Sequence, residues 1–338
     1  GQLQQALDLI QASIREDASN PIPFLNLGKT LAIAGQQEKA AGIFQEALKR
    51  NQQIPETWFC FGNALKEIEK TEEAKQAYRN ALQLNPAHTG AAVNLGALLS
   101  DDGELEEAEQ LFLKAVEQAP KDVNLRINYG KLLAEKDEHD AAIEQYQFAL
   151  PLVPDSAELH YNFANSLKEV GEVEESIASY RKAIDVKPDF AEAYLNLGNV
   201  LKEEGNIGEA IVSYRRAIEV NPDCSDAYVG LGDISKEEGE IDAAISYLRE
   251  AIQKQSDHSG ALRRFATLLH EENQAEEALN MYALVLDADQ DCDASRFHLR
   301  KAGLRDSFEC FEDLKGEIDH LYENPCNLVL EDFFHIQF

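Results

Sequence analysis

The chain has 338 residues, more than one ordinary compact core holds, which indicates two domains or an array of repeats. Its 62 acidic and 31 basic residues give a net charge of -31, so its surface would repel nucleic acid and anionic membranes, whereas a basic or neutral protein partner is allowed. The sequence contains no run of about 18 apolar residues that would span a membrane.

Residues 1–20 are predicted to form a single helix. Ala6 and Ile10 stand 34 residues before Ala40 and Phe44, so this segment matches the second half of the repeat that follows it. Such a helix lacks its partner helix, and we expect an exposed surface through which the chain can self-associate. The chain opens with Gly1 instead of methionine, and a natural array ends in a polar cap, so we expect further repeats upstream.

A period of 34 residues runs without insertion or deletion through residues 21–292. Position eight of the unit is glycine or alanine, and positions 20 and 27 are also small, which lets two helices approach closely. Position 24 is aromatic in every unit except one, where Leu248 stands, and this large side chain would fill the space between the helices. The eight units begin at Pro21, Pro55, Thr89, Val123, Ala157, Ala191, Ser225 and Ser259.

Each unit is predicted to be a pair of antiparallel helices, A (positions one to 14) and B (positions 15 to about 30). Glycines in the turn between the two helices suit a left-handed helix C-cap, and prolines at position 32 separate one unit from the next. This pattern resembles the tetratricopeptide repeat (TPR). The resemblance implies an all-α fold, in which the pairs stack into a right-handed superhelical α-solenoid because one pair cannot bury its apolar face alone.

Beyond Cys292 the period decays, because Arg300 replaces the small residue at position eight. Residues 293–324 are predicted to form a degenerate repeat and a capping helix, whose apolar side carries Phe308, Phe311, Leu314, Ile318 and Leu321. Residues 325–338 form an apolar, aromatic tail. This tail could be a strand on the cap or a linker, and we favour the start of a further domain.

One face of helix A is rich in asparagine and lysine, since positions six, nine, 12 and 13 share a face by helical spacing. Position six is interrupted at Cys60, Gly230 and Arg264, so a continuous row is best supported between residues 94 and 196. The row comprises Asn26, Asn94, Asn128, Asn162 and Asn196 at position six, Asn63, Asn165 and Asn199 at position nine, and Lys168 and Lys202 at position 12.

The segments NFANSLKEVG (162–171) and NLGNVLKEEG (196–205) are similar to repeats of the O-GlcNAc transferase superhelix. That resemblance implies that the asparagines line an inner groove and hold the backbone of an extended polypeptide. A carboxamide has an acceptor oxygen and two donor hydrogens, so it can pair with a peptide C=O and N–H whatever the side chains are. Alternatively, asparagine at positions six and nine bonds to neighbouring helices and has only a structural role.

Position 13 is acidic in seven consecutive units, at Glu67, Asp101, Glu135, Glu169, Glu203, Glu237 and Glu271. A row of carboxylates along the inner wall would favour a basic ligand. The alternative is a solvated helix end that lysine at position 12 neutralises locally. Position five is mostly apolar, so the basic residues with which some TPR proteins clamp an acidic chaperone tail are missing, and such a tail is a poor ligand.

No Walker loop, dinucleotide fingerprint, nucleophile elbow or metalloprotease motif is present. The acidic run 287–295 has Cys292 where a calcium loop needs glycine.

Five irregularly spaced cysteines form neither a disulfide framework nor a zinc site, which is typical of a reducing, cytoplasmic location. We therefore predict no catalytic residue, no metal, no cofactor and no enzyme activity.

Three functions remain open from the sequence. The one we favour is a scaffold for protein–protein interaction that binds an extended polypeptide segment in the concave groove. The second is a substrate-recruiting arm of a larger transferase, with a glycosyltransferase-like catalytic domain beyond Phe338. The third is an assembly protein whose copies associate through the unpaired helix at residues 1–20.

Overall fold

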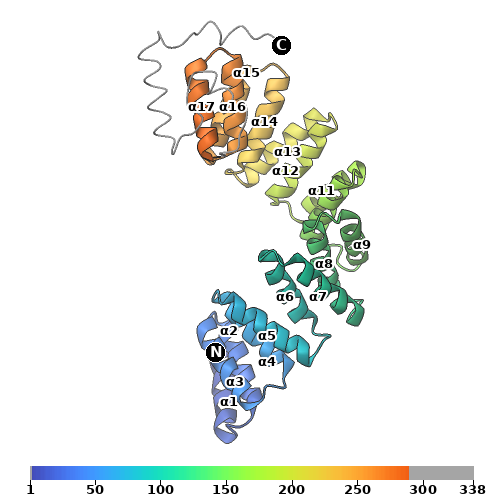
Figure 1. Ribbon diagram of the computed structural model, residues 1–338, viewed down its shortest axis with the longest axis vertical. Coiled ribbons are helices and arrows are strands. Elements are labelled where there is room, and N and C mark those ends of the chain that lie inside the picture. The colour runs from blue at the N-terminus through green and yellow to red at the C-terminus, as the bar shows by residue number, and fades with distance from the viewer. Residues whose placement is uncertain (1, 289–338) are drawn as a thin grey trace. The chain divides into compact units, whose positions relative to one another are not determined.

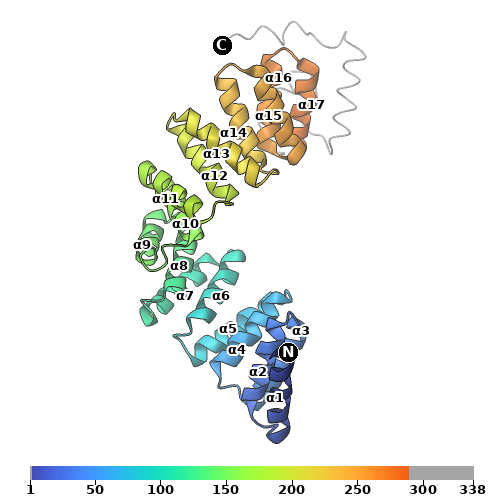
Figure 2. The same cartoon turned by 180° about the vertical axis from the view of Figure 1, so that it is seen from behind.

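The computed structural model describes residues 2–288, and Figures 1 and 2 show this part from opposite sides. The predicted degenerate repeat and capping helix (293–324) and the apolar tail (325–338) lie outside the described residues. The described part contains 17 helices and no strand, so the predicted all-α fold of stacked helix pairs is confirmed. The chain divides into two compact units, residues 1–176 and 177–338, which are described separately below.

Unit 1 begins with α1 (Gln2–Glu16), which packs against the first A helix, and Leu9 of α1 is 72% exposed. The A helices of unit 1 are α2 (Pro21–Ile33), α4 (Pro55–Glu67), α6 (Thr89–Asp101), α8 (Val123–Glu135) and α10 (Ala157–Glu169). Its B helices are α3 (Gln37–Arg50), α5 (Thr71–Leu84), α7 (Leu105–Gln118) and α9 (His139–Ala149). Each of these B helices packs against the A helix before it and the A helix after it.

Helix α11 (Val173–Val186) crosses the boundary between the two units. The A helices of unit 2 are α12 (Ala191–Glu203), α14 (Ser225–Glu237) and α16 (Ser259–Glu271). Its further B helices are α13 (Ile207–Val220), α15 (Ile241–Lys254) and α17 (Ala275–Ala288). The pairs α12–α13, α14–α15 and α16–α17 pack in the same way as the pairs of unit 1.

The two helices of a pair meet where an aromatic ring at position 24 lies on the backbone of a glycine at position eight. A Cβ atom added to Gly96 would lie 2.4 Å from the ring of Phe112, and one added to Gly62 would lie 2.6 Å from Tyr78. Both rings are buried, with at most 1% of their surface exposed. The small residue is therefore required by the closeness of the two helices, as the sequence predicted.

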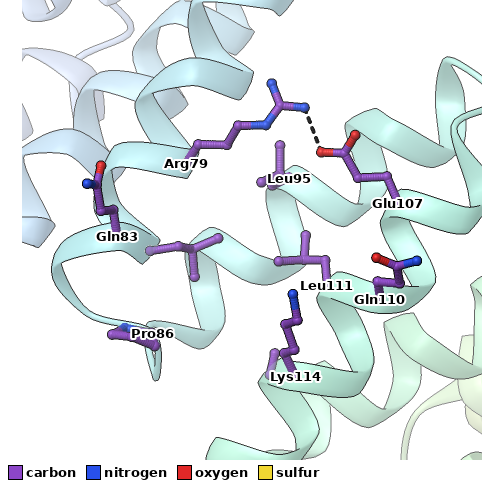
Figure 3. Close-up of a pocket in the computed structure, with 10 residues that line it drawn as sticks. Arg79, Gln83, Pro86, Leu95, Glu107, Gln110, Leu111 and Lys114 are labelled. Atoms are coloured by element: carbon purple, nitrogen blue, oxygen red, sulfur yellow. Dashed lines mark hydrogen bonds and ion pairs between the residues drawn. The ribbon is translucent and has the colours of Figure 1, made fainter.

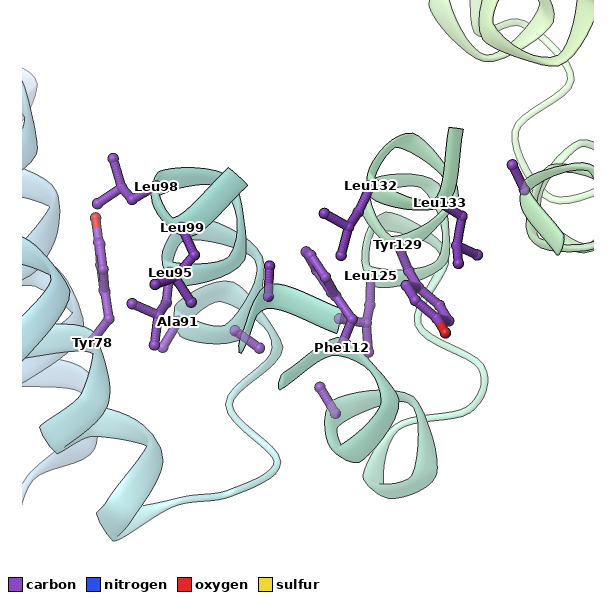
Figure 4. Packing of buried hydrophobic residues seen from close by; sticks show 14 of the residues in the cluster. Tyr78, Ala91, Leu95, Leu98, Leu99, Phe112, Leu125, Tyr129, Leu132 and Leu133 are labelled. Carbon is purple, nitrogen blue, oxygen red and sulfur yellow. The ribbon is translucent and has the colours of Figure 1, made fainter. Parts of the chain in front are cut away.

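The core of unit 1 is continuous from α4 to α10, because the A helices contribute large apolar side chains on both sides of position eight. Leu95 and Leu99 of α6 lie close to Tyr78 of the preceding pair, and the ring of Phe112 stacks on that of Tyr129 at 5.8 Å between centroids (Figure 4). This unbroken apolar layer explains why one pair alone would leave an apolar face in water.

Every turn between helix A and helix B contains one residue in the left-handed conformation, always at position 15. Five of these residues are the predicted glycines, Gly35, Gly103, Gly171, Gly205 and Gly239, with φ between 74° and 83°. The other three are Glu69, Asp137 and Asn273, with φ of 61°, 60° and 58°. The turn geometry is thus imposed by the repeat as a whole, even where the local residue disfavours it.

None of the helices in the described residues combines the length and the apolar character that a membrane-spanning segment requires.

We predict that Glu69→Gly raises the free energy of unfolding of unit 1 by about 1 kcal/mol. Glycine adopts the left-handed conformation without the steric strain of a glutamate at the same position. Part of this gain in stability is offset by the greater conformational freedom of glycine in the unfolded chain. Native-state hydrogen exchange of the α4 and α5 amides measures the change. Asn273→Gly is the control and should change the stability of its own pair by less than about 0.5 kcal/mol, because asparagine tolerates this conformation. A loss of stability in Glu69→Gly would contradict the account.

We also predict that Gly96→Ala destabilises unit 1 by at least about 2 kcal/mol, because its methyl group overlaps the buried ring of Phe112. Gly42→Ala is the matched control. Gly42 lies inside α3 with no atom within 4 Å of the added Cβ, so alanine should stabilise that helix by about 1 kcal/mol. Urea denaturation followed by circular dichroism distinguishes the two, and equal effects would exclude the proposed contact.

Candidate functional site

A recess of about 410 Å³ opens in unit 1 between the A helices α2 and α4, and Asn94 of α6 completes its lining. Buried Phe44 and Ala64 belong to its apolar part. Its polar part comprises Lys29, Gln37, Asn63, Lys66, Glu67 and Asn94. The recess therefore brings together Asn63 and Asn94, two of the asparagines predicted from the sequence, beside a surface that can cover an apolar side chain.

The two carboxamides in the recess belong to one hydrogen-bond network with a buried tyrosine. The Tyr78 hydroxyl donates to Asn63 Oδ1 at 2.8 Å, and Asn94 Nδ2 donates to the same oxygen at 2.8 Å. Burial raises the pKa of Tyr78 to about 12, so its hydroxyl stays a donor at neutral pH. These bonds use the oxygen of Asn63 and the amide of Asn94, and they leave Asn63 Nδ2 and Asn94 Oδ1 at the recess.

The bond between the tyrosine at position 24 and the asparagine at position nine recurs in unit 2, where the Tyr214 hydroxyl donates to Asn199 Oδ1 at 2.8 Å. A buried hydroxyl needs a partner, and for Tyr78 and Tyr214 position nine of the facing helix supplies it. The sequence contains a signal for this pairing, because asparagine at position nine occurs only in units with tyrosine at position 24. Units with phenylalanine there have Lys29 or Ala97 instead.

The other predicted asparagines of unit 1 lie on the A helices in different settings. Asn26 is exposed, and Asn162 is half-buried. Asn128 is half-buried and donates from Nδ2 to the carbonyl of Asn124 at 2.8 Å within its own helix, which leaves its Oδ1 available. Asn165 is half-buried and is not free of partners. Of the lysines, Lys168 is paired with its neighbour Glu169 at 3.1 Å.

In unit 2 ion pairs hold part of the same face, in addition to the carboxamide of Asn199. Asp233 at position nine accepts from Arg264 at position six of the next repeat at 2.8 Å, the 31-residue link that joins Asn63 to Asn94 in unit 1. Lys202 also pairs with Asp233, at 3.2 Å. Asn196 is half-buried and has a partner. The face of unit 2 is therefore more fully occupied by its own contacts.

The interruptions of the asparagine row have separate physical causes. A Cβ atom added to Gly230 would lie 2.5 Å from the ring of Tyr214, so no asparagine fits there. At position six of the last repeat, Arg264 forms an ion pair with Asp233 instead. Cys60 lines the recess, and burial raises the pKa of its thiol to about 12, so the thiol is unreactive at neutral pH.

The acidic side chains at position 13 are all exposed. Three of them have partners: Glu135 accepts from Ser100, Glu169 pairs with Lys168, and Glu271 pairs with Lys236 at 2.8 Å. No ion pair is present for the other four within residues 2–288, namely Glu67, Asp101, Glu203 and Glu237. Each stands near the C-terminal end of its A helix, where the helix dipole disfavours a negative charge.

Sequence reasoning missed Lys29 and Ile33 as residues of the recess. Ile33 had a signal, since it occupies position 13, which is acidic in the other seven units, and its side chain is 85% exposed. The recess itself had none, because it depends on how three helices meet. Among residues 2–288 no cluster of histidine, cysteine or carboxylate side chains could hold a metal ion.

Comparisons with known proteins agree with the helix pairs. A family model described as "TPR repeat" matches residues 130–171 and 164–205, and models described as "Tetratricopeptide repeat" match residues 191–224 and 235–302. Residues 24–128 match the model of the "Cilia and flagella-associated protein 70 middle TPR-like domain". No curated protein sequence matches the chain.

Several solved structures share this architecture. The human IFIT1 dimer with m7Gppp-AAAA is 18% identical, with a TM-score of 0.59 over 88% of this chain and 76% of that chain. The Cut9–Hcn1 hetero-tetramer of APC/C is 15% identical, with a TM-score of 0.57 over 88% and 58% of the two chains. PilF of Pseudomonas aeruginosa is 17% identical, with a TM-score of 0.54 over 67% and 97%. At these identities the likeness concerns the fold alone.

We predict that Asn63→Ala lowers the free energy of unfolding of unit 1 by about 1–3 kcal/mol, because it leaves the buried Tyr78 hydroxyl without its acceptor. Tyr78→Phe should cost only about 1 kcal/mol, since Asn63 keeps its bond to Asn94. Chemical denaturation of the two variants measures both values. Asn162→Ala, with a half-buried side chain on the same face, is the control. An equal loss of stability in this variant would show that the loss in Asn63→Ala does not come from the hydrogen bond to Tyr78.

Proposed function

Because the chain belongs to the tetratricopeptide-repeat family, we propose that it is a protein-interaction scaffold whose A helices in unit 1 bind an extended polypeptide segment. The observation that carries this proposal is the recess at Asn63 and Asn94. There one carboxamide keeps a donor and the other keeps an acceptor, beside an apolar surface.

The donor and the acceptor match the two polar groups of a peptide unit. Asn63 Nδ2 can donate to a ligand carbonyl, and Asn94 Oδ1 can accept from a ligand N–H. Asn128 Oδ1 and the carboxamide of Asn162 offer the same chemistry one and two repeats further along unit 1. Recognition of this kind reads the backbone, so it tolerates many sequences. A substrate-recruiting arm of a larger enzyme would use the same face.

The free energies of these contacts indicate weak binding, to which the apolar part of the recess contributes. Four carboxamide contacts at about 0.5–1.5 kcal/mol each provide roughly 2–6 kcal/mol, whereas micromolar affinity requires about 8 kcal/mol. Burial of one aliphatic side chain supplies about 1.5–3 kcal/mol more. The ligand would therefore place one apolar side chain against Phe44 and Ala64, while its backbone bonds to the asparagines.

The charges on this face favour a neutral or basic ligand. Glu67 lines the recess, and the exposed Asp101 follows one repeat later, at the same position of its A helix. Both carboxylates lack an ion pair within the described residues, and a cationic side chain of the ligand would relieve their unfavourable interaction with the helix dipole.

The test uses the tightest binder from an array of random 12-residue peptides, measured by fluorescence polarisation with the full chain. We predict that Asn128→Ala and Asn162→Ala each weaken binding by about two- to tenfold, the value of one hydrogen bond. Asn80→Ala, on the B helix α5, should leave it unchanged. Methylation of alternate backbone nitrogens of the peptide should abolish binding. If the methylated peptide binds as well as its parent, the backbone is not recognised and the proposal is wrong.

A further inference from the structure

A second groove lies in unit 1 between the B helices α5 and α7, and α6 contributes to its floor (Figure 3). Its volume is about 520 Å³. It shares no residue with the recess between the A helices. The groove is lined by Leu82, Gln83 and Pro86 from α5 and the turn after it, by Leu95 of α6, and by Gln110, Leu111 and Lys114 of α7, among others.

The floor of this groove is apolar because Leu82, Leu95 and Leu111 line it together. Leu111 stands at position 23 of its repeat, where it lies beside the groove with Leu82. At the same position of the next repeat stands Gln145, whose side chain is held by Arg126 at 2.7 Å, and Ser213 stands there in unit 2. Leu111 therefore places an apolar side chain at a position where the repeats of Gln145 and Ser213 have a polar one.

The ion pair at one end of the groove recurs in unit 2, at Arg181–Glu209 and Arg249–Glu277, so the charge that distinguishes this groove is that of Lys114. The Arg79 guanidinium donates to Glu107 at 2.8 Å and bridges α5 and α7 at one end of the groove. The Lys114 side chain extends into the groove toward Leu111 (Figure 3). Within residues 2–288, Lys114 has no ion pair, although Glu117 follows it by three residues.

That absence is informative because equivalent cations do pair. Lys182 and Arg216 occupy the same position of their repeats. Each forms an ion pair with a carboxylate three residues later, at 3.9 Å in Lys182–Asp185 and at 2.6 Å in Arg216–Glu219. At Lys114 the ammonium group is directed over an apolar floor instead, where an incoming carboxylate would meet it.

We propose that this groove, named the B-face groove, docks a short acidic and apolar peptide segment of another protein. An apolar side chain of the partner rests on Leu82 and Leu111, and a carboxylate one helical turn or less away bonds to Lys114. The net charge of -31 repels acidic ligands at long range, so a carboxylate without adjacent apolar contact does not bind. The A helices, with their unpaired carboxylates, favour a basic ligand, whereas the B-face groove favours an acidic one. The two faces of unit 1 therefore do not compete for one partner.

The experiment measures fluorescence polarisation with the full chain and three labelled 12-residue probes at concentrations up to about 1 mM. One probe has leucine and glutamate at helical spacing, one has leucine and lysine, and one has serine and glutamate. The leucine–glutamate probe should bind best. Lys114→Glu should weaken it about tenfold, as expected for reversal of one partly shielded charge pair. Lys121→Glu changes the charge equally on an exposed turn and should have no effect.

Three results would overturn the proposal. The first is an absence of binding by the leucine–glutamate probe, or binding that the leucine–lysine or serine–glutamate probe equals. The second is an equal response of Lys114→Glu and Lys121→Glu. The third is a concentration-dependent dimer in sedimentation experiments that Lys114→Glu abolishes, because the occupant would then be a second copy of this chain. Asn162→Ala should leave the probe's affinity unchanged, which separates this groove from the site between the A helices.

Discussion

The structure depends on the contact between an aromatic ring of helix B and the bare backbone of helix A. At Gly28, Gly62, Gly96, Gly130 and Gly198 the ring lies where a Cβ atom would otherwise be, at 2.4–2.8 Å from its ideal position. Such closeness buries the ring almost completely and fixes the distance between the two helices of a pair. Because this contact recurs at intervals of 34 residues, successive pairs present similar surfaces to one another, and the apolar layer continues from α4 to α10 of unit 1.

This contact also determines the polar surface of the A helices. At Tyr78 and Tyr214 the hydroxyl of the ring reaches position nine of helix A, where Asn63 and Asn199 provide the acceptor. The acceptor in turn is linked over 31 residues to position six of the next repeat, through Asn94 in unit 1. The row of asparagines is therefore partly structural. Its capacity to bind a ligand lies in the donor and acceptor atoms that this network leaves unused.

Much of the fold was predictable because side chains at a fixed period encode it, and the helix pairs were confirmed on that basis. The left-handed turns at Glu69, Asp137 and Asn273 were not marked by glycine and follow from the repeat as a whole. The placement of the candidate site was less predictable. The sequence favoured the row from residue 94 to 196, whereas the recess lies at Asn63 and Asn94, because it depends on how α2, α4 and α6 meet. The B-face groove depends on how α5, α6 and α7 meet and on the direction of the Lys114 side chain, which periodicity does not reveal.

The central claim is that free atoms of the asparagine side chains on the A helices of unit 1 bind the backbone of a polypeptide. The most direct measurement is the NMR spectrum of the side-chain amide groups in protein labelled with nitrogen-15 at asparagine, recorded during titration with an array-selected peptide. If the backbone is bound in this way, the signals of Asn63, Asn94, Asn128 and Asn162 shift together, while that of Asn80 on α5 stays in place. If the peptide binds and these four signals do not move, the asparagine row is structural only and the claim is wrong.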